Sequence, residues 1–256
     1  MNIALLQLLP LEPNNGRLKK YLQSCKKQKV QIAAFSEYIF QPFYKEITKD
    51  SKDFAKSCAK LLSHLHKLSV SYHLDIVAPI LLCEKGKVYK SIALIQGERV
   101  QFYHQQRLIG YSHWNERAFF DNVLPNSPKT PLVFEKEGIK IGIIAGFEIH
   151  FDEIWLKLKS AKVDVVIMPC SNTFDSKERW RILCQARAFN NSMVILRLNA
   201  INSLSYDGVI WQFYGDSMFV NADGRIKDSL DNREGVMLVE LEKLYIETIQ
   251  KEWGFR

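Results

Sequence analysis

Four short stretches of this 256-residue sequence carry residue types that could do chemistry, and each follows a largely apolar run. They are Glu37, the segment 103–107, the turn 146–148 and Cys170. A carboxylate at the end of a buried strand has a raised pKa and can move protons near neutrality. A thiol nearby can attack a bound carbonyl group. Taken alone, Glu37 fits capping of loop backbone equally well.

The turn at Gly146 is the point around which these stretches are organised. An apolar strand, 141–145, precedes it, an amphipathic helix around Trp155 follows it, and a second apolar strand covers 164–168. This order predicts a βαβ unit. In many α/β enzymes such a turn holds a nucleophile above the sheet, with a free backbone N–H beside it. Glycine at the apex has no side chain with which to attack.

The elements that must position these residues alternate between strand and helix, which predicts an α/β fold in a single domain over residues 1–256. A basic helix is expected after an N-cap at Asn14 or Asn15, and further helices at about 50–72 and 177–190. The segment 108–131 is predicted to be a functional loop. Strands are predicted at 2–8, 31–35, 75–79, 87–96, 99–103, 133–135, 140–145, 164–168, 193–198, 217–221 and 235–241, with a loop through 207–208.

Composition excludes several classes of protein. No apolar run reaches the ~18 residues of a membrane span, and the apolar start lacks the basic flank of a signal peptide. Much of the net charge of +7 lies in the early basic helix, where the one aromatic residue, Tyr21, is on the apolar face and not among the charges. This charge predicts a solvated face, and nucleic-acid binding is not expected. An odd number of scattered cysteines predicts a reducing, cytoplasmic location: Cys25, Cys58, Cys83, Cys170 and Cys184.

The order of these elements and motifs resembles the nitrilase, or carbon–nitrogen hydrolase, superfamily over most of the chain. The resemblance implies a four-layer α-β-β-α sandwich, a glutamate–lysine–cysteine triad and no cofactor. The motifs that carry it are N-I-A-L-L-Q (2–7), A-A-F-S-E-Y (33–38), Y-H-Q-Q-R-L (103–108), H-W-N-E-R-A-F-F (113–120), A-G-F-E-I-H-F-D-E (145–153), V-D-V-V-I-M-P (163–169) and A-R-A-F-N-N (186–191).

The resemblance also implies a role for individual positions. Glu37 matches the general base and Glu116 a second active-site glutamate, whereas Gln105 stands at the lysine position and Gly146 at the cysteine position. In the family the thiolate attacks an amide or nitrile carbon, and the lysine and a backbone N–H hold the developing oxyanion. The residues expected to contact a substrate are Tyr38, Phe147, Glu148 and Asn172.

The two departures, at 105 and 146, decide the expected activity. Loss of a nucleophile from such a unit removes ~10⁶ of rate, and loss of an oxyanion donor removes roughly 10²–10³. Cys170 is a candidate substitute nucleophile, although a buried, inert cysteine chosen for size is the simpler interpretation. His150 is a candidate base or a structural hydrogen-bonding residue. Cys184 is expected to be packing, and His64 and His66 do not share a helix face, so no metal site is predicted.

Three hypotheses follow. The first is a degenerate hydrolase that binds a small amide, carboxylate or amine ligand, or a protein partner. The second is a working amidase that uses Cys170 or a water activated by Glu37. The third is a scaffold. The resemblance further implies a homo-oligomer, dimeric or built from dimers, with the charged, aromatic tail 242–256 in the subunit interface.

Overall fold

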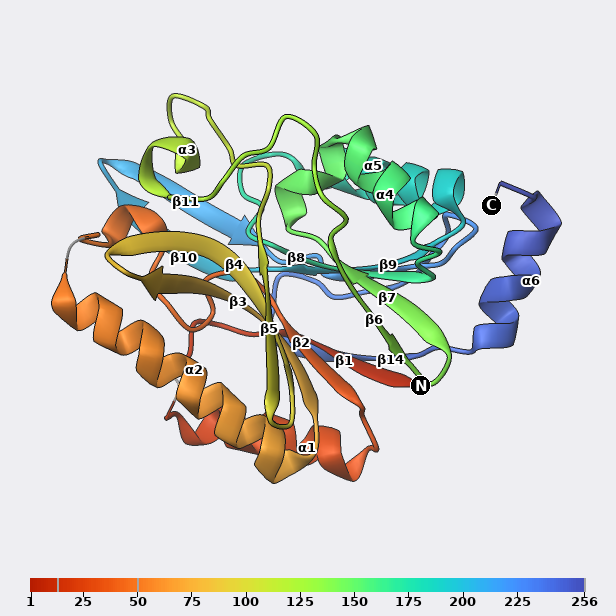
Figure 1. Ribbon diagram of the computed structural model, residues 1–256, viewed down its shortest axis with the longest axis horizontal. Coiled ribbons are helices and arrows are strands. Elements are labelled where there is room, and N and C mark those ends of the chain that lie inside the picture. The colour runs from red at the N-terminus through yellow and green to blue at the C-terminus, as the bar shows by residue number, and fades with distance from the viewer. Residues whose placement is uncertain (13, 50, 256) are drawn as a thin grey trace.

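The computed structural model describes residues 1–12, 14–49 and 51–255. Two six-stranded sheets pack face to face, and a helix pair covers the outer face of each sheet (Figure 1). The four-layer α-β-β-α sandwich expected from the sequence is therefore present. Both faces of each sheet are buried, which explains why the central strands are apolar almost throughout.

The first sheet has the strand order β14-β1-β2-β3-β4-β5. Strands β1, β2 and β3 are parallel, and β3, β4 and β5 are joined by hairpins. The elements are β1 (Asn2–Gln7), α1 (Gly16–Lys27), β2 (Ile32–Phe35), α2 (Lys52–Tyr72), β3 (Asp75–Glu84), β4 (Lys87–Gln96), β5 (Arg99–His104) and β14 (Gly235–Glu240).

The second sheet has the order β13-β12-β9-β8-β7-β6, with β7, β8 and β9 parallel. The predicted βαβ unit around Gly146 is thus confirmed. Its elements are β6 (Leu132–Lys136), β7 (Ile139–Ile143), α4 (Asp152–Ser160), β8 (Val165–Cys170), α5 (Lys177–Asn191), β9 (Val194–Asn199), β12 (Met218–Val220) and β13 (Ile226–Ser229). Short 3₁₀ turns cover Tyr44–Glu46 (η1) and Gly146–His150 (η2).

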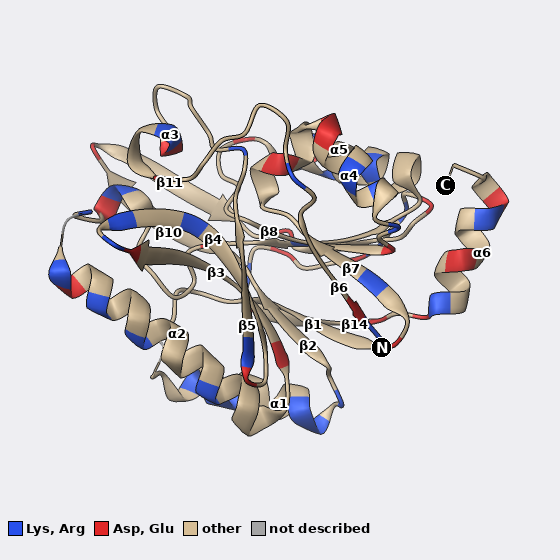
Figure 2. Ribbon diagram, in the orientation of Figure 1, with Lys and Arg blue, Asp and Glu red and all other residues tan. Residues whose placement is uncertain are grey.

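Local sequence explains how the first helix begins and which face it buries. The Asn15 side chain accepts a hydrogen bond from the Arg17 backbone N–H, as an N-cap does. Leu18, Leu22 and Cys25 are buried against the sheet. The lysines of this helix are exposed, and Figure 2 shows a similar row of basic residues along the outside of α2. The basic charge therefore forms a solvated outer face.

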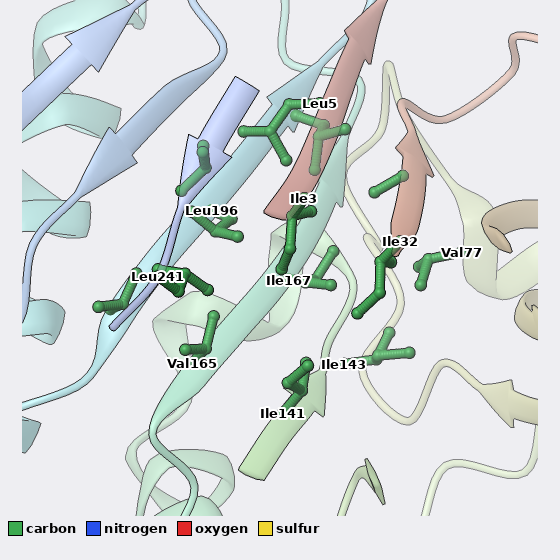
Figure 3. Close-up of a cluster of buried hydrophobic side chains, with 14 of the residues drawn as sticks. Ile3, Leu5, Ile32, Val77, Ile141, Ile143, Val165, Ile167, Leu196 and Leu241 are labelled. Carbon is green, nitrogen blue, oxygen red and sulfur yellow. The ribbon is translucent and has the colours of Figure 1, made fainter. Parts of the chain in front are cut away.

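Branched aliphatic side chains fill the space between the two sheets. Figure 3 shows Ile3, Leu5 and Ile32 of the first sheet lying toward Ile143 and Ile167 of the second. All five are fully buried. Complete burial of one such side chain contributes about 1.5–3 kcal/mol. This layer fixes the two sheets relative to each other, and so fixes the strand ends that form the site.

Several predicted boundaries need correction. The loop predicted through 207–208 is a hairpin of β10 (Ile201–Tyr206) and β11 (Val209–Tyr214). Strand β13 was not predicted, β3 continues to Glu84, and the segment 108–131 contains the short helix α3 (Glu116–Phe119). The predicted start of the second helix, Asp50, lies outside the described residues.

The C-terminal segment forms the helix α6 (Lys243–Trp253), which lies beyond the end of the sheets (Figure 1). Trp253 and Phe255 pack edge-to-face against Phe189 of α5, yet each remains about two-fifths exposed or more. A place for this segment in a subunit interface stays a prediction, and Arg256 lies outside the described residues. None of the described helices is long and apolar enough to cross a membrane.

Candidate active site

The candidate site lies where the carboxyl ends of β2 and β8, one from each sheet, meet. The Glu37 backbone N–H donates to the Cys170 carbonyl oxygen at 3.3 Å. The Ser171 hydroxyl donates to Glu37 Oε2 at 2.6 Å. Parallel strands commonly present functional residues at this end. The two sheets are therefore linked at Glu37, through hydrogen bonds of both its backbone and its carboxylate.

A lysine that the sequence interpretation did not select completes this site. Lys90 Nζ lies 2.6 Å from Glu116 Oε1 and 3.3 Å from Glu37 Oε2. The same ammonium group lies 5.6 Å from the centre of the Tyr38 ring, within reach of a cation–π interaction. Lys90 comes from β4, Glu37 from the end of β2 and Glu116 from the start of α3. These three residues are called the ion cluster below.

Each carboxylate of the ion cluster has further hydrogen-bond donors. Glu116 is completely buried, and it also accepts from Trp114 Nε1 at 3.1 Å and from the Ile109 backbone N–H at 3.2 Å. The Lys90 backbone is fixed by Asn122, whose side chain bonds both its N–H and its carbonyl oxygen at 2.8 Å. The charges are thus paired and held, as buried charges must be.

Burial and pairing have opposite effects on the pKa values in the ion cluster. Burial raises the pKa of Glu37, and the nearby Lys90 ammonium opposes that shift without cancelling it. Burial by itself would lower the pKa of Lys90, but the Glu116 and Glu37 carboxylates outweigh burial and raise it well above its usual value. Pairing with the two carboxylates therefore favours the charged form of Lys90, whereas burial disfavours the charged form of Glu37.

Gln105, at the position where the resemblance expects a lysine, is buried beside the ion cluster. Its Nε2 donates to the Arg107 carbonyl oxygen at 2.7 Å, which turns the amide toward its own loop. Its Oε1 has no hydrogen-bond partner among the described residues. Gln105 lines a small cavity together with Glu37, Tyr38 and Lys90.

Gly146 and Cys170 share one packing space. A Cβ placed on Gly146 would lie 2.7 Å from Cys170 Sγ, closer than packed atoms approach, and 3.1 Å from Cys170 Cβ, which is a tight contact. The thiol therefore fills the space that a side chain at 146 would need. Glycine at the apex of the turn leaves this space free for the Cys170 thiol.

The Cys170 thiol is buried and does not line any of the cavities at the site. It packs in the core between the second sheet and its helices, with Cys184 and Met168, and it is 1% exposed. It donates to the Met168 carbonyl oxygen at 3.4 Å, and burial strongly raises its pKa. A buried neutral thiol is a poor nucleophile. This placement favours packing as the role of Cys170, as for Cys184.

A cavity of about 500 Å³ opens beside the ion cluster. Among the residues that line it are Glu37, Lys90, Gly146, Phe147 and Asn172. The size and the mixed polar and aromatic wall suit a small molecule. His150 also lines the cavity, and its Nδ1 lies 2.9 Å from the Phe147 carbonyl oxygen, a contact within its own turn.

Two residues predicted to contact a substrate lie elsewhere. Glu148 is completely buried behind the turn and does not line the cavity; it accepts from Tyr103 Oη at 2.8 Å and from the Gln106 and Ala145 backbone N–H groups at 2.7 and 2.9 Å. Tyr38 lines two neighbouring cavities instead. Its backbone has a φ of 58°, which is rare for a residue with a side chain.

The sequence did contain a signal for Lys90. The hairpin turn at 97–98 pairs Gln96 with Arg99, and the pairing continues to Ser91 with His104. The next pair in this register is Lys90 with Gln105, whose backbone N–H donates to the Lys90 carbonyl oxygen at 3.0 Å. The predicted second strand ended at residue 103, and only its continuation by two residues in the same register places a lysine opposite position 105.

This arrangement offers a ligand in the cavity a hydrogen-bond acceptor, Glu37, beside a charged donor, Lys90. It offers no nucleophilic side chain at the apex of the turn. No group of three or more metal-ligating side chains occurs within residues 1–12, 14–49 and 51–255. Recognition of a small polar group is the chemistry that this geometry supports.

Comparison with known proteins identifies the same architecture. A family model described as carbon–nitrogen hydrolase matches residues 2–251. No curated protein sequence matches the chain. A carbon–nitrogen hydrolase from Helicobacter pylori G27 is 14% identical, with a TM-score of 0.83 over 100% of this chain and 94% of that one. An amidase from Nesterenkonia sp. is 20% identical, with a TM-score of 0.80 over 99% and 96%.

A further similar structure belongs to a longer protein, glutamine-dependent NAD+ synthetase from Acinetobacter baumannii. It is 20% identical, with a TM-score of 0.83 over 96% of this chain. The chain spans only 46% of that protein. At these levels of identity the similarity shows the fold.

Because positions 146 and 170 share one packing space, mutations at the two positions should have non-additive effects on the free energy of unfolding. Gly146→Ala should lower the free energy of unfolding by about 1–3 kcal/mol, because the new Cβ overpacks against the Cys170 thiol. Gly146→Ala with Cys170→Ala should recover part of this loss, whereas two independent sites would show additive losses. Urea unfolding of the parent, both single variants and the double variant measures the coupling. Additive losses would contradict the shared packing space.

Glu148 predicts a pH dependence of stability. Burial raises its pKa from 4.5 to about 7, so the folded protein keeps a proton that the unfolded chain releases. Stability from this group is complete at low pH and is lost as the pH rises from about 4.5 to 7, by on the order of 3 kcal/mol. Urea unfolding at pH 5 and pH 7.5 should show a steeper fall for the parent than for Glu148→Gln, which cannot titrate. Equal slopes would contradict this prediction.

Proposed function

Since the chain belongs to the carbon–nitrogen hydrolase family, we propose that it binds a small primary carboxamide in the cavity beside the ion cluster and forms no covalent intermediate with it. The observation that carries this proposal is the pair formed by Gly146 and Cys170. The apex has no nucleophile, and the nearest thiol is buried on the other side of the strand.

The side chains at the cavity favour an amide over an acid or an amine. A primary carboxamide has one carbonyl acceptor and an NH₂ donor, which match Lys90 and Glu37 respectively. When both glutamates are ionised, the ion cluster has a net negative charge, which disfavours a carboxylate ligand. An amine has no carbonyl acceptor for the Lys90 donor.

A structural neighbour supports ligand binding without the thiol. A variant of the Nesterenkonia amidase in which a cysteine is replaced by alanine was solved in complex with butyramide. In that protein the fold still holds an amide after the substitution. Butyramide is therefore a suitable first probe for the present chain.

The test compares three ligands of one chain length: butyramide, butyrate and butylamine. Ligand-observed NMR should show binding of butyramide in preference to the other two, and an ammonia assay with intact-mass analysis should show neither turnover nor a covalent adduct. Glu37→Gln should weaken butyramide binding, because the acceptor for its NH₂ group becomes a neutral amide.

Other outcomes would support the alternatives. Ammonia release that Cys170→Ala abolishes would establish a relocated nucleophile. Release that survives Cys170→Ala but not Glu37→Gln would establish attack by a water that Glu37 activates. Absence of binding by all three ligands would reject the proposal and favour a scaffold role.

A further inference from the structure

We infer that Lys90 takes over, from the neighbouring strand, the place that a lysine at position 105 would occupy, and that its ammonium group donates a hydrogen bond to the carbonyl oxygen of the bound ligand. The part that concerns the ligand rests on the proposed function. The part that concerns the ammonium group rests on the geometry of β4 and β5.

The hairpin register places the two positions opposite each other. Directly paired residues of an antiparallel ladder point to the same face, with Cβ atoms about 4.5–5.5 Å apart. Ile92 and Tyr103, two pairs further along, both face the space between the sheets. Lys90 and Gln105 are two residues from that pair in each strand, so they lie on the same inner face. A lysine on either strand can bring its ammonium group to the same point.

The contacts of Lys90 show that its ammonium group is at the site. It pairs with carboxylates from β2 and α3, and it lines the 500 Å³ cavity together with Gly146 and Phe147. A lysine has three N–H donors. Glu116 and Glu37 account for two of them, and no third acceptor contacts Nζ among the described residues. One donor is therefore available to a ligand in the cavity.

Gln105 does not provide this donor. Its NH₂ group is directed at the Arg107 carbonyl oxygen, and it does not line the 500 Å³ cavity. The chain therefore keeps one cation at the ion cluster, and that cation comes from β4. A second lysine at 105 would place two ammonium groups beside two carboxylates.

An exchange of the two side chains tests the inference. Lys90→Gln should weaken butyramide binding at least about tenfold, because a charged donor is lost. The double variant Lys90→Gln with Gln105→Lys returns the cation from the other strand, and should bind within about threefold of the parent. Lys87→Gln removes an exposed lysine from the same strand and should leave binding unchanged. Ligand-observed NMR gives the dissociation constants, and thermal unfolding reports folding of each variant.

Stability provides a second readout, which separates this inference from the proposed function. Lys90→Gln leaves two buried carboxylates without a cation, so its Tm should fall, and the exchange variant should recover most of the loss. If the parent binds none of the three ligands, the proposed function fails together with the ligand contact, and recovery of Tm still supports the relocated ammonium group.

Restoring a nucleophile gives a readout in activity. The double variant Gly146→Cys with Cys170→Ala opens the packing space and places a thiol at the apex, with Lys90 untouched. It should convert butyramide and water into butyrate and ammonia, and adding Lys90→Gln should abolish that release. Adding Gln105→Lys as well should restore it.

Two results would overturn the inference. One is a folded Lys90→Gln variant that binds butyramide as the parent does. The other is an exchange variant that fails to fold, or that folds with the parental Tm but binds no better than Lys90→Gln.

Discussion

The ion cluster of Glu37, Lys90 and Glu116 is the interaction on which the rest of the site depends. Moving one charge into a protein interior costs several kcal/mol, and only paired charges with further hydrogen bonds offset that cost. Here the three members come from β2, β4 and α3, so the cluster forms only when all three elements are in place. The Ser171 hydroxyl adds the second sheet. The charged groups that line the cavity are therefore in place only when these parts of the fold have assembled.

The sandwich beneath the site determines where these groups can come from. The aliphatic layer between the sheets holds β2 and β8 so that their carboxyl ends touch, through the Glu37 backbone N–H and the Cys170 carbonyl oxygen. Glu148, behind the turn, ties the end of β7 to the end of β5 through backbone hydrogen bonds. The turn is thus a rigid part of the cavity wall even though it carries no nucleophile.

Much of the fold was predictable because its signals are local. The cap at Asn15, the hairpin turn at 97–98 and the strand–turn–helix order around Gly146 each depend on a few adjacent residues. The hairpin of β10 and β11 was not found, because an Asp-Gly pair fits an open loop as well as a turn. Within the site, Glu37 and Gly146 were placed by sequence, but Lys90 required the register of two strands to be followed to its end.

The side chain of Cys170 illustrates a limit of the sequence. Residues 165–168 are all apolar, because both faces of β8 are covered, so no alternation marks which face each residue occupies. Only the structure assigns Val165 and Ile167 to the layer between the sheets, and Val166, Met168 and Cys170 to the layer beneath the helices. The sequence left Cys170 open as a substitute nucleophile or a packing residue, with packing the simpler interpretation, and the structure buries it.

Cys170 and Lys90 differ in how far a side chain can reach from its strand. Cysteine has a single rotatable bond before its sulfur, so the face of the strand fixes where the thiol lies. Even at 2.7 Å from the position of a Cβ at 146, Cys170 Sγ is buried in the layer beneath the helices, and Cys170 does not line the cavity. The lysine side chain has four flexible carbons. A lysine on a neighbouring strand can therefore still bring its ammonium group to the point between the two carboxylates. A lysine on either of two paired strands can therefore place its ammonium group beside the same carboxylates. A cysteine on a neighbouring strand cannot place its sulfur at the apex of the turn. This difference explains how the chain has a charged hydrogen-bond donor at the cavity while it lacks a nucleophile at the apex of the turn.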